Sequence, residues 1–279
     1  MRVCLANLVL ALALLSGCRG VLQHATVPNA TLPNKYELQA DQLLFKSDFV
    51  LPADHRLVRE LTAERGDLCR TLGLPCANEQ IEVYLFHDAA AYSQFLSKHF
   101  PGLPSRRAFF LETDTRLTVY AHWSDRVAED LRHEVAHGYL HSVAPGLPLW
   151  LDEGLAEFFE VPRGHGGLNR PHVELLSDMI QLENWQPNLQ ELEQLSDASQ
   201  MQQRHYAEAW AWVYYLLNSG PQTRDVLTAY LADVRDNGKA GALSVRLTGR
   251  YAAPEATLSE FLVALNEQAL ATRSSNVTR

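Results

Sequence analysis

The chain has 279 residues, of which 47% are hydrophobic and 20% are charged, and this composition is that of an ordinary globular protein. It excludes a disordered or collagen-like chain, and the length is sufficient for a substantial core. The formal net charge is −9, with 24 Lys and Arg against 33 Asp and Glu, and the sequence contains no basic block of five or more residues. Because phosphate binding draws on clustered Lys and Arg, nucleic acid is not expected as a main partner.

The first residues have the features of a secretory signal peptide. Arg2 is followed by an apolar run from Val3 to Leu15, which is too short to span a bilayer. Residues 15–18 (LSGC) resemble the lipobox of bacterial lipoproteins, in which the cysteine is acylated and becomes the first mature residue. The resemblance implies a lipid anchor on Cys18 and, because Arg19 rather than Asp follows it, an outer-membrane position facing the periplasm. An ordinary signal peptide that happens to contain a cysteine is the alternative.

The next segments predict an α+β lobe. Residues 19–35 contain several Pro and Asn and lack apolar periodicity, so we expect a tether there. Apolar residues at helical spacing predict a helix within 48–72, which ends at Gly73 and Pro75. After it we expect a strand at 81–86, a helix from 89 to about 99, and strands at 108–111 and 117–121.

From Arg126 onward nearly every segment predicts a helix. The expected helices are 126–142, 148–160, 171–183, 204–218, 221–235 and 258–271. The fold class is therefore α+β, with a small N-terminal mixed α/β sheet lobe that has an edge strand, followed by a mostly α-helical lobe. The expected parts are a signal peptide (1–17), a lipidated cysteine and tether (18–35), the α+β lobe (36–125) and the helical lobe (126–279).

Two of the four cysteines remain for a structural role, because Cys4 lies in the signal peptide and Cys18 is the expected lipidation site. An oxidising periplasm permits a disulfide between Cys69 and Cys76. Closing so short a loop would stabilise the fold by about 2.5 kcal/mol. Two free buried thiols are the alternative, and no pattern of His or Asp around them suggests catalysis.

The chemistry is expected on the helix 126–142, which contains His133-Glu134-Val-Ala-His137. Residues four apart project from one face of a helix, so both imidazoles can hold one metal ion. Glu134 lies on the flank of that face, where it can contact a water at the metal without being a ligand. Two neutral imidazoles and an open position suit Zn²⁺, and HExxH is the pattern of zinc metallopeptidases.

A catalytic zinc site needs a third protein ligand, and Glu153 stands in the segment 148–160, PLWLDEGLAEFFE. Pro145 and Gly146 supply a turn and Pro148 can open a helix, so this segment is expected to return antiparallel to the first helix.

This part of the sequence resembles the gluzincin zinc peptidases, the clan of thermolysin and the large aminopeptidases, in which a helix with a glutamate ligand follows HExxH. The resemblance implies one Zn²⁺ bound by His133, His137 and Glu153, on a zincin-like active-site helix between the lobes. It also implies close helix packing at Gly154 and Ala156.

Other ligand assignments are less favoured. His141 lies one turn further along the helix and is rotated by about 80° from His133, so it is expected outside the ligand set. The metzincin class is excluded, because Leu140 and Val143 stand where that pattern needs a glycine and a third histidine. An exposed helix carboxylate is the alternative for Glu153.

The resemblance implies further roles around the metal. An acidic residue one turn past the glutamate ligand often accepts a hydrogen bond from a ligating histidine, which is expected of Glu157. Tyr206 begins a Tyr-Ala-Glu-Ala-Trp segment similar to a helix in secreted and lipoprotein members of this group. It is expected to donate a hydrogen bond to the developing oxyanion, with His205 as the alternative donor. The strand 117–121 is expected to be the clan's edge strand, which binds an extended peptide.

The function that the resemblance implies is a lipid-anchored zinc metallopeptidase of the bacterial envelope, acting on peptide or protein substrates. Glu134 would serve as general base and then general acid for zinc-assisted hydrolysis. No G-x-M-E-N stretch precedes the HExxH, so an endopeptidase or oligopeptidase is expected rather than an aminopeptidase. Two alternatives stay open: a non-proteolytic zinc-binding lipoprotein and a zinc amidase acting on cell-wall material.

Overall fold

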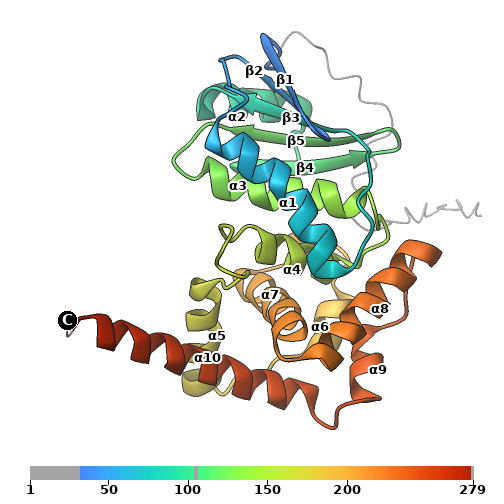
Figure 1. The fold of residues 1–279 in the computed structure, drawn as a ribbon, viewed down its shortest axis with the longest axis vertical. Coiled ribbons are helices and arrows are strands. Elements are labelled where there is room, and N and C mark those ends of the chain that lie inside the picture. The colour runs from blue at the N-terminus through green and yellow to red at the C-terminus, as the bar shows by residue number, and fades with distance from the viewer. Residues whose placement is uncertain (1–31, 104–105, 278–279) are drawn as a thin grey trace, which may run out of the picture.

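The computed structural model describes residues 32–103 and 106–277, with side chains described as far as residue 271. The expected signal peptide, Cys18 and nearly all of the tether lie outside these residues. A five-stranded sheet with its helices comes first and a mostly helical region follows, which confirms the expected α+β class (Figure 1). No helix of the described residues combines the length and the apolar character that a membrane crossing requires.

The first half holds the strands. Its elements are β1 (Tyr36–Ala40), β2 (Leu43–Ser47), α1 (Arg56–Leu72), β3 (Ile81–Phe86), α2 (Ala89–His99), β4 (Ala108–Thr113) and β5 (Arg116–His122). The second half is helical. Its elements are α3 (Val127–His141), α4 (Leu149–Phe159), α5 (Arg170–Glu183), α6 (Leu189–Gln194), a short 3₁₀ turn (Ala198–Gln200), α7 (Gln203–Asn218), α8 (Pro221–Asn237), α9 (Leu243–Thr248) and α10 (Pro254–Val277).

The sheet has the strand order β1-β2-β3-β5-β4. Strands β2, β3 and β5 run parallel, while β1 and β4 pair antiparallel with their neighbours at the two edges. Parallel neighbours need crossover connections, which α1 and α2 provide. A tight turn joins β1 to β2, and its Asp41 has a φ of 54°, a left-handed conformation that Asp tolerates.

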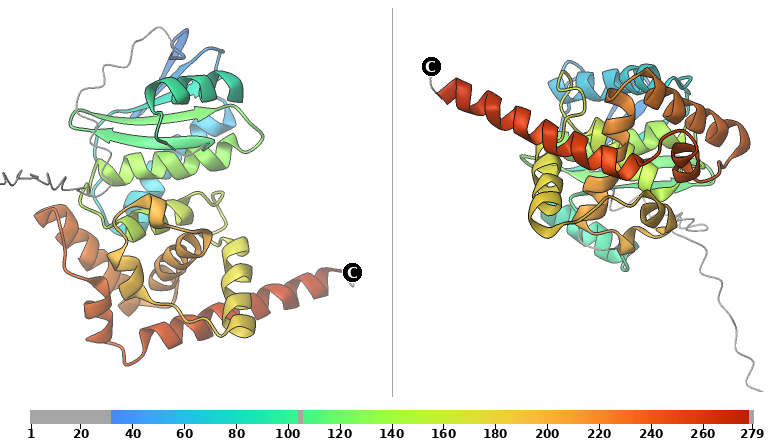
Figure 2. Two further views of the ribbon diagram at one scale, coloured as in Figure 1. Left: turned by 180° about the vertical axis from the view of Figure 1, so that it is seen from behind. Right: turned by 90° about the horizontal axis from the view of Figure 1, so that it is seen from below.

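Each face of the sheet has its own core, because successive side chains point to opposite faces. Val83 and Leu85 pack with the apolar residues of α1 and α3. Tyr84 and Phe86 face the other way and pack with the aromatic residues of α2. Figures 1 and 2 show α2 on one side of the sheet and α1 and α3 on the other. The sheet is therefore covered on both faces, and α3 lies between it and the other helices of the second half.

The expected assignment of the edge strand is wrong. The strand around Leu117–Ala121 is β5, which lies inside the sheet, hydrogen-bonded to β3 on one side and to β4 on the other. The edge strand on this side of the sheet is β4, a strand of mixed polarity. The physical reason is visible in β5, whose residues 117–121 are all buried, as an internal strand of a two-sided sheet requires.

Several elements differ from the expected ones. Four short elements were not expected from the sequence: β1, β2, α6 and α9. They carry too few apolar residues for a clear periodicity, and β1 is largely exposed. The first helix begins at Arg56 rather than near residue 48. Its start is set by His55, whose Nδ1 accepts a hydrogen bond from the backbone N–H of Leu57 at 3.3 Å, three residues after Pro52.

Cys69 and Cys76 are joined by a disulfide, with their Cα atoms 5.7 Å apart. It links the last turn of α1 to the loop before β3. Gly73 lies between the two cysteines and ends α1 in a left-handed conformation, with a φ of 67°.

Helix α4 packs tightly against α7 through a glycine. A Cβ on Gly154 would lie 2.5 Å from the carbonyl oxygen of Ala209, so only glycine permits this approach. The neighbouring Ala156 is fully buried. On the outer side, α10 crosses α5 and extends past it, as the views in Figure 2 show.

The turn between α3 and α4 is also held closely. A Cβ on Gly146 would lie 2.0 Å from the carbonyl oxygen of Gly238, the left-handed residue that ends α8. The short connection that sets the antiparallel pairing of α3 and α4 is therefore in backbone contact with the end of a distant helix.

Substituting Gly154 tests the α4–α7 contact. An alanine in a helix normally stabilises it by about 1 kcal/mol relative to glycine. At residue 154 we expect the opposite sign, with Gly154→Ala lowering the free energy of unfolding by about 1–3 kcal/mol through overpacking. Urea unfolding measures this. Gly241→Ala is the control, because nothing lies within 4 Å of its Cβ position. A Gly154→Ala protein as stable as the wild type would contradict the packing argument.

Candidate metal centre

The two histidines of the HExxH pattern meet on one face of α3. The Nε2 atoms of His133 and His137 lie 3.3 Å apart, and the ring planes are inclined at 76°. The charged residues of α3 interact favourably with the helix dipole, because Glu129 and Asp130 stand in its first turn and His141 stands in its last turn.

The third expected ligand approaches from α4. The Oε2 atom of Glu153 lies 3.5 Å from Nε2 of His133 and 3.6 Å from Nε2 of His137. The side chain of Glu153 is buried, so water does not compete strongly for these contacts. The structure thus brings together His133, His137 and Glu153, one of the groups whose donor atoms could hold a metal ion.

The triangle of donor atoms fits a zinc ion. Ligand atoms on a tetrahedral zinc with bonds of about 2.0–2.1 Å lie about 3.3–3.4 Å from one another. The three separations here, 3.3, 3.5 and 3.6 Å, are close to that value. Two imidazoles and one carboxylate leave a fourth position for water or substrate, which is the donor set of catalytic rather than structural zinc sites.

Glu134 adjoins this triangle without belonging to it. It is 9% exposed, and burial raises its pKa above the usual value, although the positive charges of His133 and His137 oppose that rise. A carboxylate whose pKa is raised in this way holds a proton more readily, which suits a group that must accept one and pass it on.

Each of these two imidazoles has a carboxylate oxygen near its second nitrogen. The Nδ1 atom of His133 lies 3.2 Å from Oε2 of Glu160, and Nδ1 of His137 lies 3.0 Å from Oδ1 of Asp152. Such partners fix the tautomer and the orientation of a ligating ring. Glu157 was expected to be the partner of a ligating histidine, but its Oε2 contacts Nε2 of His172 at 2.8 Å. The carboxylate beside Nδ1 of His133 is instead that of Glu160.

The charges of the three candidate ligands are strongly coupled. Burial alone would raise the pKa of Glu153, but hydrogen bonds with His133 and His137 outweigh it and lower that pKa to about 2. Burial alone would lower the pKa of His137, but the carboxylates of Asp152 and Glu153 raise it to about 10. A metal ion would therefore compete with protons for these nitrogens, and its binding would release protons.

Tyr206 lies at the start of α7, half-buried. Burial and the negative charge of Glu153 raise the pKa of its phenol, while a hydrogen bond with Arg106 opposes the rise. The phenol thus lies within electrostatic range of the ligands and keeps its proton at neutral pH. His205, the alternative donor, is buried, and its Nδ1 accepts a hydrogen bond from the backbone N–H of Gln202 at 2.9 Å, which caps α7.

Three residues near the candidate centre were not expected from the sequence: Asp152, Glu160 and Arg106. A signal for Glu160 was present, because it lies seven residues after Glu153 and so on the same face of α4. Asp152 directly precedes Glu153 in the sequence. Whether its side chain reaches α3 depends on how α3 and α4 cross, which the sequence does not show. Arg106 precedes β4, and only the folded chain brings it to Tyr206.

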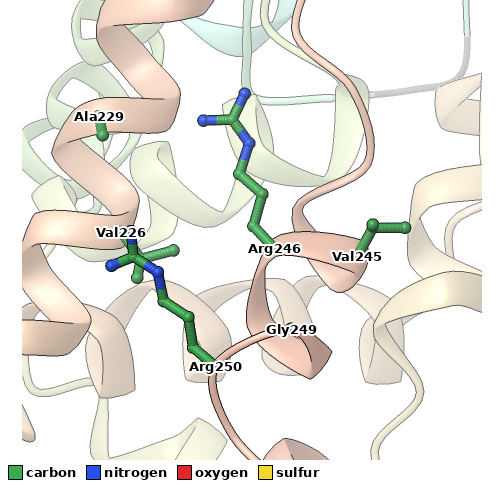
Figure 3. A pocket seen from close by; sticks show the side chains of 6 residues that line it. All are labelled: Val226, Ala229, Val245, Arg246, Gly249 and Arg250. Atoms are coloured by element: carbon green, nitrogen blue, oxygen red, sulfur yellow. The ribbon is translucent and has the colours of Figure 1, made fainter.

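A separate pocket of about 270 Å³ lies between α8 and α9, lined by Val226, Ala229, Val245, Arg246, Gly249 and Arg250. Figure 3 shows the two arginine side chains extending into different parts of it. Arg246 is already paired with Asp233 at 2.7 Å and lies over the ring of Tyr230. The pocket shares no residue with the His and Glu cluster and carries no comparable set of reactive groups.

A family model described as "Protein of unknown function (DUF1570)" matches residues 127–236. The matched part runs from the start of α3 almost to the end of α8 and includes His133, His137, Glu153 and Tyr206. No curated protein matches this chain.

Proposed function

We propose that this chain is a zinc-dependent metallopeptidase. The observation that carries the proposal is the triangle of His133 Nε2, His137 Nε2 and Glu153 Oε2, with the buried Glu134 beside it. A site with only structural use has no need of a general base and usually fills all four positions with Cys or His. The resemblance to gluzincins in the same residues supports this reading.

The proposed chemistry assigns one task to each group. A bound zinc ion lowers the pKa of water towards about 7 and polarises a carbonyl oxygen. Glu134 takes the proton of the attacking water and delivers it to the leaving amine. Tyr206 donates its O–H to the oxygen on which negative charge develops. His133, His137 and Glu153 stay fixed, because each is buried or packed and each imidazole has a carboxylate partner.

The proposed substrate is an extended peptide bound along β4. This strand is last in the sheet order, so one of its edges faces away from β5. An extended chain can add to such an edge through main-chain hydrogen bonds. The ring of Phe110 on β4 is stacked on that of His137, with centroids 6.0 Å apart, so this strand packs against the candidate centre, which supports the proposed binding place.

The proposal includes an envelope location. Cys18 and its lipobox lie outside the described residues, so this part rests on the sequence resemblance alone. The Cys69–Cys76 disulfide agrees with an oxidising compartment such as the periplasm.

Replacing Glu134 tests the proposed reaction. Glu134→Gln should bind zinc in the same amount as the wild type, because Glu134 is not a ligand. Its turnover should fall by about 10²–10⁴-fold, because the general base is lost. Metal analysis and cleavage of an unbiased peptide library measure the two quantities. Glu260→Gln, at an exposed residue of α10, should retain full activity, and a zinc chelator should abolish wild-type activity reversibly.

The same experiment separates the alternatives. A wild-type protein that binds zinc but cleaves neither peptides nor envelope fractions would be a non-proteolytic zinc-binding lipoprotein. Release of products from envelope fractions alone would identify an amidase acting on cell-wall material. Equal peptide cleavage by wild type and Glu134→Gln would contradict the proposed mechanism.

Removing one hydroxyl tests Tyr206. Tyr206→Phe should lower kcat by about 10²-fold with zinc content unchanged, because the oxyanion loses one hydrogen-bond donor. Steady-state kinetics on the best library peptide measure this. Tyr214→Phe is the matched control, since Tyr214 lies on the same helix and stacks on Trp210. A kcat for Tyr206→Phe equal to that of the control would remove Tyr206 from the mechanism.

Replacing Cys18 tests the anchor. Wild type expressed in a bacterial host should incorporate labelled palmitate and sediment with the membranes, whereas Cys18→Ser should do neither. Cys4→Ser, which alters a cysteine inside the expected signal peptide, should behave as the wild type. Continued palmitate labelling of Cys18→Ser would contradict the lipobox assignment.

A further inference from the structure

A chain of polar side chains connects the edge strand to a candidate metal ligand. Glu112 on β4 contacts His141 with its Oε2 atom 2.7 Å from Nδ1. The other nitrogen of His141, Nε2, lies 2.9 Å from Oδ2 of Asp152. The second oxygen of Asp152, Oδ1, lies 3.0 Å from Nδ1 of His137. Three contacts therefore lead from β4 to His137, whose remaining nitrogen points at His133 and Glu153.

Both nitrogens of His141 are engaged by carboxylate oxygens, and a carboxylate can only accept. An imidazole in this arrangement donates from both nitrogens, so it offers no free lone pair to a metal ion. In this structure His141 therefore faces Glu112 and Asp152 with its two nitrogens, although it lies one turn from His137.

The three side chains that lead to His137 are largely sheltered from water. The side chains of His141 and Asp152 are 15% and 14% exposed, and that of Glu112 is 31% exposed. Hydrogen bonds to charged groups in such places are stronger than those at the surface, and a buried group left without its partner is costly. With one oxygen held by His141, the carboxylate of Asp152 is restrained, and its other oxygen forms an ion-pair contact of 3.0 Å with Nδ1 of His137, although neither of these two buried atoms has a hydrogen-bond partner.

The ring of His141 is also fixed by packing. The ring of Phe110 meets it edge-on, with centroids 5.0 Å apart. Phe110 and Glu112 are two residues apart on β4, so they share one face of the strand. Strand β4 therefore holds His141 by a ring contact and by a hydrogen bond at once.

We propose that His141 and Glu112 are positioning residues that hold Asp152, and through it the ring of His137, in the orientation for binding a metal ion. The inference rests on the metal site of the proposed function but not on the peptidase activity. It makes the edge strand part of the support of the metal centre.

The test compares zinc affinities of full-length variants. His141→Phe keeps a ring against Phe110 but removes both hydrogen bonds, and Glu112→Ala removes one. Each should weaken zinc binding by about 10-fold, the lower end of the range for outer partners of a ligand. His141→Gln, which can still donate to Asp152, and Glu112→Gln, which can still accept from His141, should recover most of that loss.

The measurements are chelator competition for zinc and the visible spectrum of the cobalt-substituted protein, which responds to ligand orientation. His165→Phe, in the exposed loop after α4, is the control and should bind zinc as the wild type does. Thermal unfolding shows whether each variant is folded. If His141→Phe does not fold, the pair Glu112→Ala and Glu112→Gln gives the answer, because Glu112 is partly exposed.

Zinc affinities and cobalt spectra of the Ala and Phe variants equal to those of the wild type would overturn the inference. Equal weakening by the truncating and the conservative variants would also overturn it, because packing alone would then explain the effect. A wild type that binds zinc but cleaves nothing would contradict only the peptidase function. A wild type that binds no zinc would remove the metal site and this inference together.

Discussion

The distance between α3 and α4 is the constraint on which the candidate centre depends. His133 and His137 need only a regular helix to share a face, but Glu153 reaches them from a second helix, and its carboxylate must stop within 3.6 Å of both rings. Packing on both sides of the pair fixes that distance. The sheet lies against α3, and α7 lies against α4 at Gly154, where the backbones approach too closely for a larger residue.

Helix α4 concentrates negative charge, and its neighbours compensate it. Buried carboxylates are unstable unless they are paired and hydrogen-bonded. The four acidic side chains of this helix and its end each contact a histidine. The pairs are Asp152 with His137 and His141, Glu153 with His133 and His137, Glu157 with His172, and Glu160 with His133. This arrangement explains how so polar a region can lie within the apolar core that α3, α4 and α7 share.

The parts of the fold that the sequence predicts are those with a strong period. The helices around HExxH and Glu153 lie within a residue or two of their expected bounds, and the strand 81–86 is found as expected. Properties that depend on the third dimension were not predictable. The buried face of β5 shows its apolar character in the sequence, but only the pairing with β3 and β4 makes it internal. In the same way, the i, i+4 spacing pointed to Glu157, while the side chain beside His133 is that of Glu160, because His172 of α5 engages Glu157.

The backbone contact between Gly146 and Gly238 has a consequence for motion. The end of α8 lies directly against the turn that joins α3 to α4. Parting of the two helices at this turn would therefore require the end of α8 to move as well.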